Sequence, residues 1–164
     1  MTALPADLTD ELGRPFRVRL LEPADRDALI AMYIDFEPKR TAQGLPPVGE
    51  EAIARWLDRV VPQGIHLVAE TDGEIIGHAL LMPMGDVCAE FAIFLHQHHR
   101  NRGIGTAMNR LALETAREHG CARVWLSVQP SNRAAIRSYE KAGFRFIPTA
   151  DLWASEIEME AVLV

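Results

Sequence analysis

Hydrophobic residues fall at two different spacings along this chain, and the spacing changes from one stretch to the next. Stretches in which they alternate with polar residues, or form a short apolar run, favour strands. We expect strands at residues 16–20, 65–70, 75–82, 88–95, 123–128, 144–147 and 153–164. Asp72-Gly73 stands between the second and third of these stretches, and Asp-Gly is a strong signal for the turn of a β-hairpin.

Helical spacing marks the stretches between those strands. Apolar residues recur there every three or four positions, which gives a helix one buried face. We expect helices at residues 23–36, 50–60, 103–119 and 131–142. Pro23 suits the first turn of a helix, Ser131 suits an N-cap, and Gly120 suits the residue that follows a helix end.

Two further stretches carry neither pattern. Residues 1–14 contain Pro5 and Gly13, and we expect a flexible N-terminal tail or a short arm there. Residues 37–49 are rich in proline and glycine, which predicts a loop that could act as a lid. The order of strands and helices predicts one domain over residues 15–164, with an α/β fold in which helices flank a single mixed sheet.

Length and composition exclude several classes of protein. A chain of 164 residues is long enough for one real core, and its net charge of −6 argues against nucleic acid as a main partner. No apolar run approaches the ~20 residues of a membrane span, and the first residues lack the features of a signal peptide. Cys88 and Cys121 form no disulfide or metal pattern, so we expect a cytoplasmic protein without a metal site.

The run from Arg100 to Thr106 gives the first indication of function, because it joins a predicted strand to a predicted helix. Gly103 and Gly105 let the backbone turn tightly and let a ligand approach without meeting a Cβ. The helix start offers unpaired N–H groups and the positive end of the helix dipole. Arg100 and Arg102 add charged donors, so the segment predicts a seat for a phosphate or pyrophosphate.

The pattern Arg-x-x-Gly-x-Gly in this run follows Glu90-Phe91-Ala92-Ile93-Phe94-Leu95 and resembles the coenzyme A pyrophosphate loop of the GNAT acyltransferase superfamily. Further along, Asn132, Ala135, Tyr139 and Gly143-Phe144 stand in the pattern Asn-x-x-Ala-x-x-x-Tyr-x-x-x-Gly-Phe. This pattern resembles the second conserved block of the same superfamily. Two blocks in the right order make the resemblance specific over residues 65–147, and the N-terminal third matches more loosely.

The resemblance implies a GNAT-like acyl-CoA N-acyltransferase fold, with a mixed, mostly antiparallel central sheet and acetyl-CoA as the acyl donor. In the superfamily the strand before the loop splays from its neighbour, and a backbone N–H near Phe94 and Leu95 would face the thioester oxygen. The expected coenzyme A-binding residues are Phe94, Leu95, Arg100, Asn101, Arg102, Gly103, Ile104, Gly105, Thr106, Asn132 and Ala135. Asn132 would bond the pantetheine arm through its amide, or it would cap the following helix.

Glu90 is the candidate general base. An amine with a lysine-like pKa of ~10.4 is mostly protonated at pH 7, so some group must take that proton. Strand alternation places Glu90, Ala92 and Phe94 on one face, and small Ala92 leaves room for a substrate. The surrounding residues resemble the matching strand of protein-lysine acetyltransferase domains, in which a glutamate serves as base. A bulge would reverse the facing, and the plain alternative is a surface glutamate near Asp86.

Tyr139 is the candidate general acid for the departing coenzyme A thiolate, a role that the second block implies. Its helical neighbours Ala135 and Ile136 are apolar, so its ring should lie on the buried face of the helix. The alternative is a core tyrosine whose hydroxyl bonds to backbone.

Histidines and basic residues near these blocks have plainer interpretations. His96, His98 and His99 are close enough in sequence to suggest a metal, but the stretch offers no cysteine or carboxylate ligand, and we expect no metal there. His78 could line the acceptor pocket or be a satisfied core residue. One basic stripe is either a solvated helix face or a contact for the 3′-phosphate of coenzyme A: Arg133, Arg137 and Lys141.

We therefore interpret the chain as an acetyl-CoA-dependent N-acetyltransferase that works by direct transfer in a ternary complex. The acceptor stays open among a small primary amine, an amino-acid derivative, and a lysine or N-terminus of a protein. Acidic residues that flank the predicted loop could attract a cationic amine or be ordinary surface charge: Asp35, Glu37, Glu50 and Glu51. The alternatives are a non-catalytic coenzyme A-binding sensor or interaction module, and a nucleotide-binding α/β protein. A homodimer through the last strand is implied by the resemblance alone.

Overall fold

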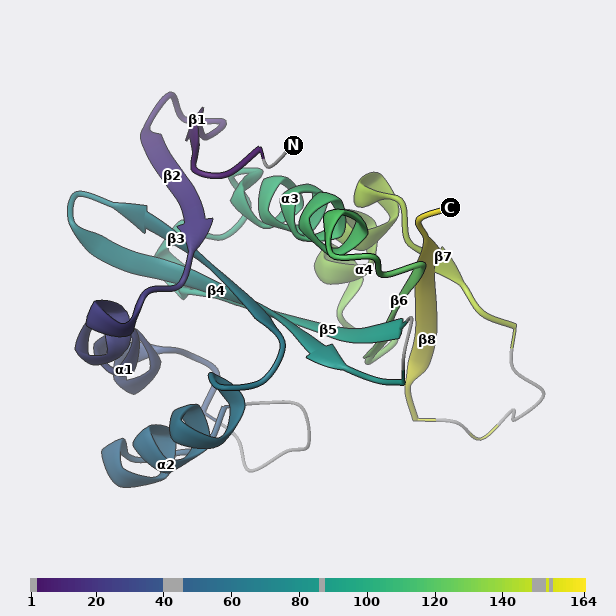
Figure 1. Cartoon of the computed structure of the whole chain (residues 1–164). Helices are drawn as coiled ribbons and strands as arrows, with labels where there is room; N and C mark the ends of the chain where they lie inside the picture. The colour runs from purple at the N-terminus through teal and green to yellow at the C-terminus, as the bar shows by residue number, and fades with distance from the viewer. Residues whose placement is uncertain (1–2, 40–45, 86–87, 149–152, 154) are drawn as a thin grey trace.

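The computed structural model describes residues 3–39, 46–85, 88–148, 153 and 155–164. Within them one eight-stranded sheet runs in the order β1-β2-β3-β4-β5-β6-β8-β7 (Figure 1). The strands are β1 (Ala6–Thr9), β2 (Pro15–Leu20), β3 (Ile65–Thr71), β4 (Glu74–Pro83), β5 (Cys88–Leu95), β6 (Arg123–Val128), β7 (Arg145–Phe146) and β8 (Ile157–Val162). The helices are α1 (Arg26–Asp35), α2 (Glu50–Val60), α3 (Ile104–Glu118) and α4 (Arg133–Ala142), with short 3-10 turns η1 (Pro23–Asp25) and η2 (Gln97–His99).

Helices cover both faces of the sheet, with α3 and α4 on one face and α1 and α2 on the other (Figure 1). Ile104 and Met108 of α3 are buried with Phe144 and the first face of the sheet. Ile53 and Leu57, one turn apart on α2, are buried with α1 and the second face. Each such side chain contributes about 1.5–3 kcal/mol when it leaves water, so these two cores hold the helices in place.

Local sequence signals explain several element boundaries. The turn between β3 and β4 has positive φ at both Asp72 and Gly73, 50° and 78°, which is the type I′ geometry that Asp-Gly favours. The predicted hairpin is therefore confirmed. The predictions for residues 50–60, 88–95 and 123–128 coincide with α2, β5 and β6, and the expected α/β fold with a mixed, mostly antiparallel sheet is confirmed.

One pair of strands differs from the rest. All neighbouring strands are antiparallel except β5 and β6, which are parallel and pair only from Cys88–Glu90 to Arg123–Trp125. Beyond that point β5 stays paired with β4 as far as Leu95, and β6 stays paired with β8 as far as Val128. The sheet therefore opens between β5 and β6 at their carboxyl ends, as the resemblance implied.

The expectation of a flexible tail over residues 1–14 is wrong for part of that stretch. Ala6–Thr9 forms β1, which pairs antiparallel with β2 and sets Leu8 opposite Phe16. The Asp10 carboxylate then accepts the backbone N–H groups of Leu12 and Arg14, both at 2.9 Å, and so closes the turn into β2. The strand is stabilised by this pairing and not by its own composition, which is why its polar sequence predicted a tail.

Smaller corrections concern the C-terminal third. Helix α4 begins at Arg133, and its N-cap is Asn132 instead of the expected Ser131. The strand expected at 144–147 is reduced to β7, and the last strand begins at Ile157 instead of residue 153. Parts of the predicted 37–49 loop and of the stretch before β8, together with Asp86, lie outside the described residues. None of the described helices is both long and apolar enough to cross a membrane.

Candidate active site

The predicted phosphate seat lies between the end of β5 and the start of α3. Gly103 is the N-cap of α3 and has a φ of +82°, a conformation that L side chains rarely adopt. Gly105 lies in the first turn with ordinary φ, and a Cβ built there would meet only Ser138 Oγ at 3.8 Å and Leu95 Cδ2 at 3.9 Å. Packing within the protein thus does not require glycine at 105, whereas a ligand lying close to this turn would.

Arg102 faces an open groove beside that seat. The groove has a volume of about 400 Å³ and is bounded on one side by the β1–β2 arm and on the other by α3. Arg110 and Lys141 also line it, together with the carboxylates of Asp10 and Glu11 from the arm. The backbone N–H of Glu11 donates to the carbonyl of Arg102 at 2.9 Å, which fastens the N-terminal arm to the loop.

Arg100 does not face this groove. Its Nε donates to the carbonyl oxygen of Leu95 at 2.9 Å, its Nη2 donates to the carbonyl oxygen of Glu37, and its guanidinium lies 5.2 Å from the centre of the Phe36 ring. These contacts connect the end of β5 to the end of α1. The prediction that Arg100 contributes a phosphate contact finds no support in this geometry, because two of its donors are engaged by backbone.

Glu90 lies on β5 at the point where the pairing with β6 ends. Cα pairing of β4 with β5 runs from Gly77–Leu95 to Pro83–Ala89 without a shift, so no bulge reverses the facing. Phe94 belongs to the core under α1 and α2, and Ala92 packs against that core, so Glu90 shares this face by alternation. Its side chain is exposed and makes no hydrogen bond or ion pair with the residues that the structure describes.

Tyr139, on α4, packs against the face of the sheet opposite to the one that carries Glu90. Its ring packs edge-on against Phe91, with centroids 6.3 Å apart, and only 8% of the residue is exposed. Burial raises the pKa of its hydroxyl to about 12. That hydroxyl has no hydrogen-bond partner among the described residues, which argues against a core tyrosine that bonds to backbone.

Asn132, the first residue of the second predicted block, caps helix α4. Its Oδ1 accepts the backbone N–H of Ala135 at 3.3 Å, so the capping alternative is observed. The amide NH₂ of the same side chain has no partner among the described residues and can still donate to a ligand. Both predicted functions are therefore compatible in one side chain.

The histidines after β5 are engaged with protein. His96 Nε2 lies 2.7 Å from Asp35 Oδ2, and His96 Nδ1 accepts the backbone N–H of His98 at 3.2 Å. The hydrogen bond with His96 lowers the pKa of Asp35, so this carboxylate is committed and does not stand ready for a cationic amine. Within the described ranges, no group of three or more histidine, cysteine or acidic side chains is placed to hold a metal ion.

A buried chain of hydrogen bonds, which the sequence did not indicate, lies between the sheet and the helices α1 and α2. Tyr33 Oη lies 2.6 Å from His78 Nδ1, and His78 Nε2 lies 2.9 Å from His66 Nδ1. His66 Nε2 contacts the carbonyls of Gln63 and Val60 at 2.7 and 3.0 Å. Because carbonyls only accept, His66 carries its proton on Nε2, His78 donates from its Nε2, and Tyr33 donates its hydroxyl proton. His78 is thus a satisfied core residue and not a wall of the acceptor pocket.

Comparison with known proteins supports the family that the two sequence blocks suggested. A sequence model of the acetyltransferase (GNAT) family matches residues 27–144. An uncharacterised N-acetyltransferase of Mycobacterium tuberculosis (strain ATCC 25618 / H37Rv) is 32% identical over 112 residues, which cover 61% of this chain and 72% of that protein. The mycothiol acetyltransferase of Thermobispora bispora is 30% identical over 158 residues, which cover 87% of this chain and 50% of that protein.

Solved structures share the fold. The GNAT domain of S. lividans PAT superposes with a TM-score of 0.80 at 23% identity, covering 96% of each chain. A candidate acetyltransferase from Salmonella typhimurium, solved with its cofactor acetyl-CoA, superposes with a TM-score of 0.70 at 20% identity, covering 91% of this chain and 94% of the other. Because the family model covers most of the chain and a relative above 30% identity supports it, this chain belongs to the acetyltransferase (GNAT) family.

Proposed function

We propose that this protein transfers an acetyl group from acetyl-CoA to a primary amine by direct attack in a ternary complex. The observation that carries the proposal is the opening between β5 and β6 beside the glycine seat of α3. Glu90 and Tyr139 flank that opening from opposite faces of the sheet, and neither side chain is committed to a hydrogen bond within the described residues.

The glycine seat supports acetyl-CoA as the donor. The first N–H groups of α3 have no partner inside the helix and point toward a site where a pyrophosphate would meet no Cβ at Gly105. Arg102 would supply a charged donor at the edge of the same site. Phe94 and Leu95 lie at the open edge of β5, where a free backbone N–H would stabilise the negative charge that develops on the thioester oxygen.

The proposed chemistry needs three proton transfers: two from the nitrogen, the second of which goes to solvent as the amide forms, and one to the sulfur. Glu90 takes the proton of the ammonium group, and the amine nitrogen then forms a bond to the acetyl carbon while the carbon–sulfur bond breaks. The hydroxyl of Tyr139 gives its proton to the departing sulfur and regains one from solvent. Since burial keeps the pKa of Tyr139 near 12, the hydroxyl holds its proton until the sulfur needs it.

The acceptor is a primary amine, on a small molecule or on a protein. The relative named mycothiol acetyltransferase, half of whose length this chain spans, is named for mycothiol and not for a protein. Small-molecule amines are therefore the first acceptors to screen.

Calorimetry of acetyl-CoA binding tests the donor site. The parent protein should bind, and Gly105→Glu should not, because its side chain fills the seat and repels the pyrophosphate. Gly105→Ala is the matched control for folding, since its Cβ meets only ordinary contacts. A folded parent that binds neither acetyl-CoA, propionyl-CoA nor free coenzyme A would refute the proposal, whereas binding without transfer to any amine would favour the alternative of a coenzyme A-binding sensor or module.

A further inference from the structure

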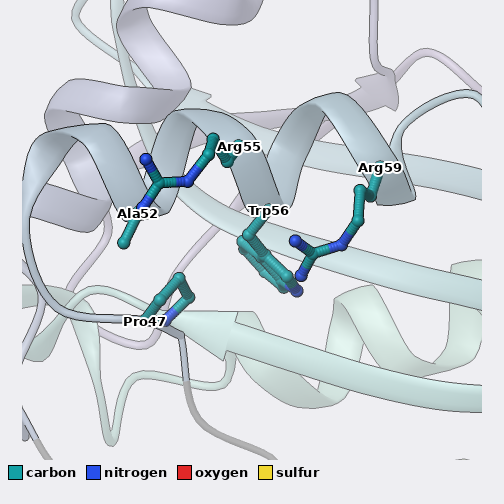
Figure 2. A pocket seen from close by; sticks show the side chains of 5 residues that line it. All are labelled: Pro47, Ala52, Arg55, Trp56 and Arg59. Carbon is teal, nitrogen blue, oxygen red and sulfur yellow. The ribbon is translucent and has the colours of Figure 1, made fainter.

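A second cavity lies along α2, on the face of the sheet that carries Glu90. Its volume is about 300 Å³. Arg55, Trp56 and Arg59 extend from α2 around it, and Pro47 of the preceding segment faces them, as Figure 2 shows. Positions 52, 55, 56 and 59 share one side of a helix, so Ala52 completes a lining that one helix supplies almost alone.

The two arginines of this cavity are free to bind a ligand. Arg55 and Arg59 are exposed, and neither guanidinium has an ion-pair or hydrogen-bond partner in the part of the chain that the structure describes. Several other arginines pair with carboxylates: Arg17, Arg19, Arg26 and Arg123. Asp58, which stands between the two on α2, is itself engaged by Arg26. Two like charges one turn apart repel each other, so an anion between them would relieve that repulsion.

Trp56 connects this cavity to the proposed acceptor site. Its ring meets Phe94 edge-on at 6.0 Å and Tyr33 edge-on at 5.2 Å between centroids. Phe94 lies on the same face of β5 as Glu90, with Ala92 between them. A molecule that spans from Glu90 to the cavity would therefore cross an apolar stretch bounded by Ala92, Phe94 and Trp56.

Resting on the proposed function, we infer that the acceptor is a primary amine that also carries an anionic group, and that Arg55 and Arg59 bind that group. Carboxylate is the expected anion, because a guanidinium presents paired donors that match its two oxygens. Trp56 packs against the apolar part that joins the amine to the carboxylate. The cavity itself is lined by two cations, whereas Glu50 and Glu51 lie in the first turn of α2 and Asp35 is paired with His96.

Matched acceptors test the inference with the whole protein. Acetylation rates are compared for ω-amino carboxylates of increasing length, the corresponding ω-amino phosphonates, and alkylamines that lack the acid. We expect a preference of at least about tenfold in kcat/KM for an acid-bearing amine, weakened by salt because the arginines are exposed. In Arg55→Gln/Arg59→Gln the preference for the acid-bearing amine should vanish, because the KM for that amine rises. The kcat for alkylamines and the affinity for acetyl-CoA should stay unchanged. Arg117→Gln, an exposed helix arginine on α3, is the control.

Two results would overturn the inference: a parent enzyme that prefers the neutral alkylamine, or an acid preference that survives in the double variant. If the parent acetylates no amine at all, the proposed function fails separately, and the cavity is then tested by calorimetry with N-acetylated ω-amino acids, which needs no turnover. Binding that the parent shows and the double variant loses supports the inference. Equal binding by both proteins, or binding by neither, refutes it.

Discussion

The hydroxyl of Tyr33 on α1 donates a hydrogen bond to Nδ1 of His78 on β4 across 2.6 Å, and both residues are almost fully buried. His78 in turn is hydrogen-bonded to His66 on β3, which contacts the carbonyl oxygens of Val60, the last residue of α2, and of Gln63. The chain thus ties both helices of the acceptor side to the sheet. A buried polar chain of this kind is stabilising only while every member keeps its partner.

Tyr33→Phe should therefore destabilise the fold. The substitution keeps the ring contacts with Trp56 and Phe94 but leaves Nδ1 of His78 buried without a donor. We expect a loss of about 1–3 kcal/mol in the free energy of unfolding, measured in urea. Tyr139→Phe serves as the comparison. The hydroxyl that it removes has no hydrogen-bond partner among the described residues, so the free energy of unfolding should fall less. An equal loss in both variants would contradict the assigned hydrogen-bond chain.

The same chain predicts how stability depends on pH. Burial lowers the pKa of His78 from 6.5 to about 3, so the folded protein holds this imidazole neutral while the unfolded chain protonates it below about pH 6.5. The stabilising contribution is fully present above pH 6.5 and is lost as pH falls toward 3. Between pH 6.5 and 5, His78 should cost the fold up to about 1.4 kcal/mol per pH unit. His78→Gln should show a shallower slope in urea titrations over that range, and identical slopes would contradict the prediction.

The central elements could be predicted from sequence because their signals are local. The alternation of Glu90, Phe91 and Ala92 fixed the facing of β5 correctly, and the core clusters confirm it. Asp72-Gly73 carried its own turn geometry. The glycines at 103 and 105 marked the loop because the absence of a side chain is itself a local signal.

What escaped prediction depends on partners far away in the chain. Strand β1 exists because Leu8 faces Phe16 across a pairing that its own composition does not indicate. His66 and His78 are diagonal neighbours in the β3–β4 hairpin, but Tyr33 reaches them only when α1 packs on the sheet, and no local pattern relates it to them. Arg100 was predicted to bind phosphate because its sequence context resembles a phosphate loop, but its side chain bonds to backbone carbonyls, which have no signature in the sequence.

Glu90→Gln tests the base. At pH 7 the variant should lose about a hundredfold or more in kcat/KM, the usual scale for a positioned base. The deficit should shrink as pH approaches the amine pKa of ~10.4, because the amine then arrives already deprotonated. Glu74→Gln, an exposed glutamate at the start of β4, is the matched control and should behave like the parent. A deficit that stays constant with pH would show that Glu90 binds or positions the acceptor instead of taking its proton.

Tyr139→Phe tests the acid. The ring and its contact with Phe91 remain, so acetyl-CoA affinity should hold while kcat falls by about a hundredfold. Because the pKa of Tyr139 is about 12, the parent should show no basic limb from this residue below about pH 10. A thioester with a less basic leaving thiol should recover part of the rate in the variant, since that thiol needs less help from an acid. An unchanged kcat in Tyr139→Phe would remove this residue from the proposed chemistry.

Arg100 and Arg102 should separate into two functions. Arg100→Gln breaks the contacts to the carbonyls of Leu95 and Glu37, so hydrogen exchange should increase at residues 35–39 and the KM for the acceptor should rise. Its affinity for acetyl-CoA should stay within about threefold, which is less than 1 kcal/mol. Arg102→Gln should do the reverse, because its side chain lines the groove beside Gly103 and the start of α3: acetyl-CoA affinity should fall about tenfold, with hydrogen exchange at residues 35–39 unchanged. If Arg100→Gln instead weakened acetyl-CoA binding as strongly as Arg102→Gln, the guanidinium of Arg100 would have to turn toward the pyrophosphate when the donor binds, and the connection between β5 and α1 would be a feature of the empty enzyme alone.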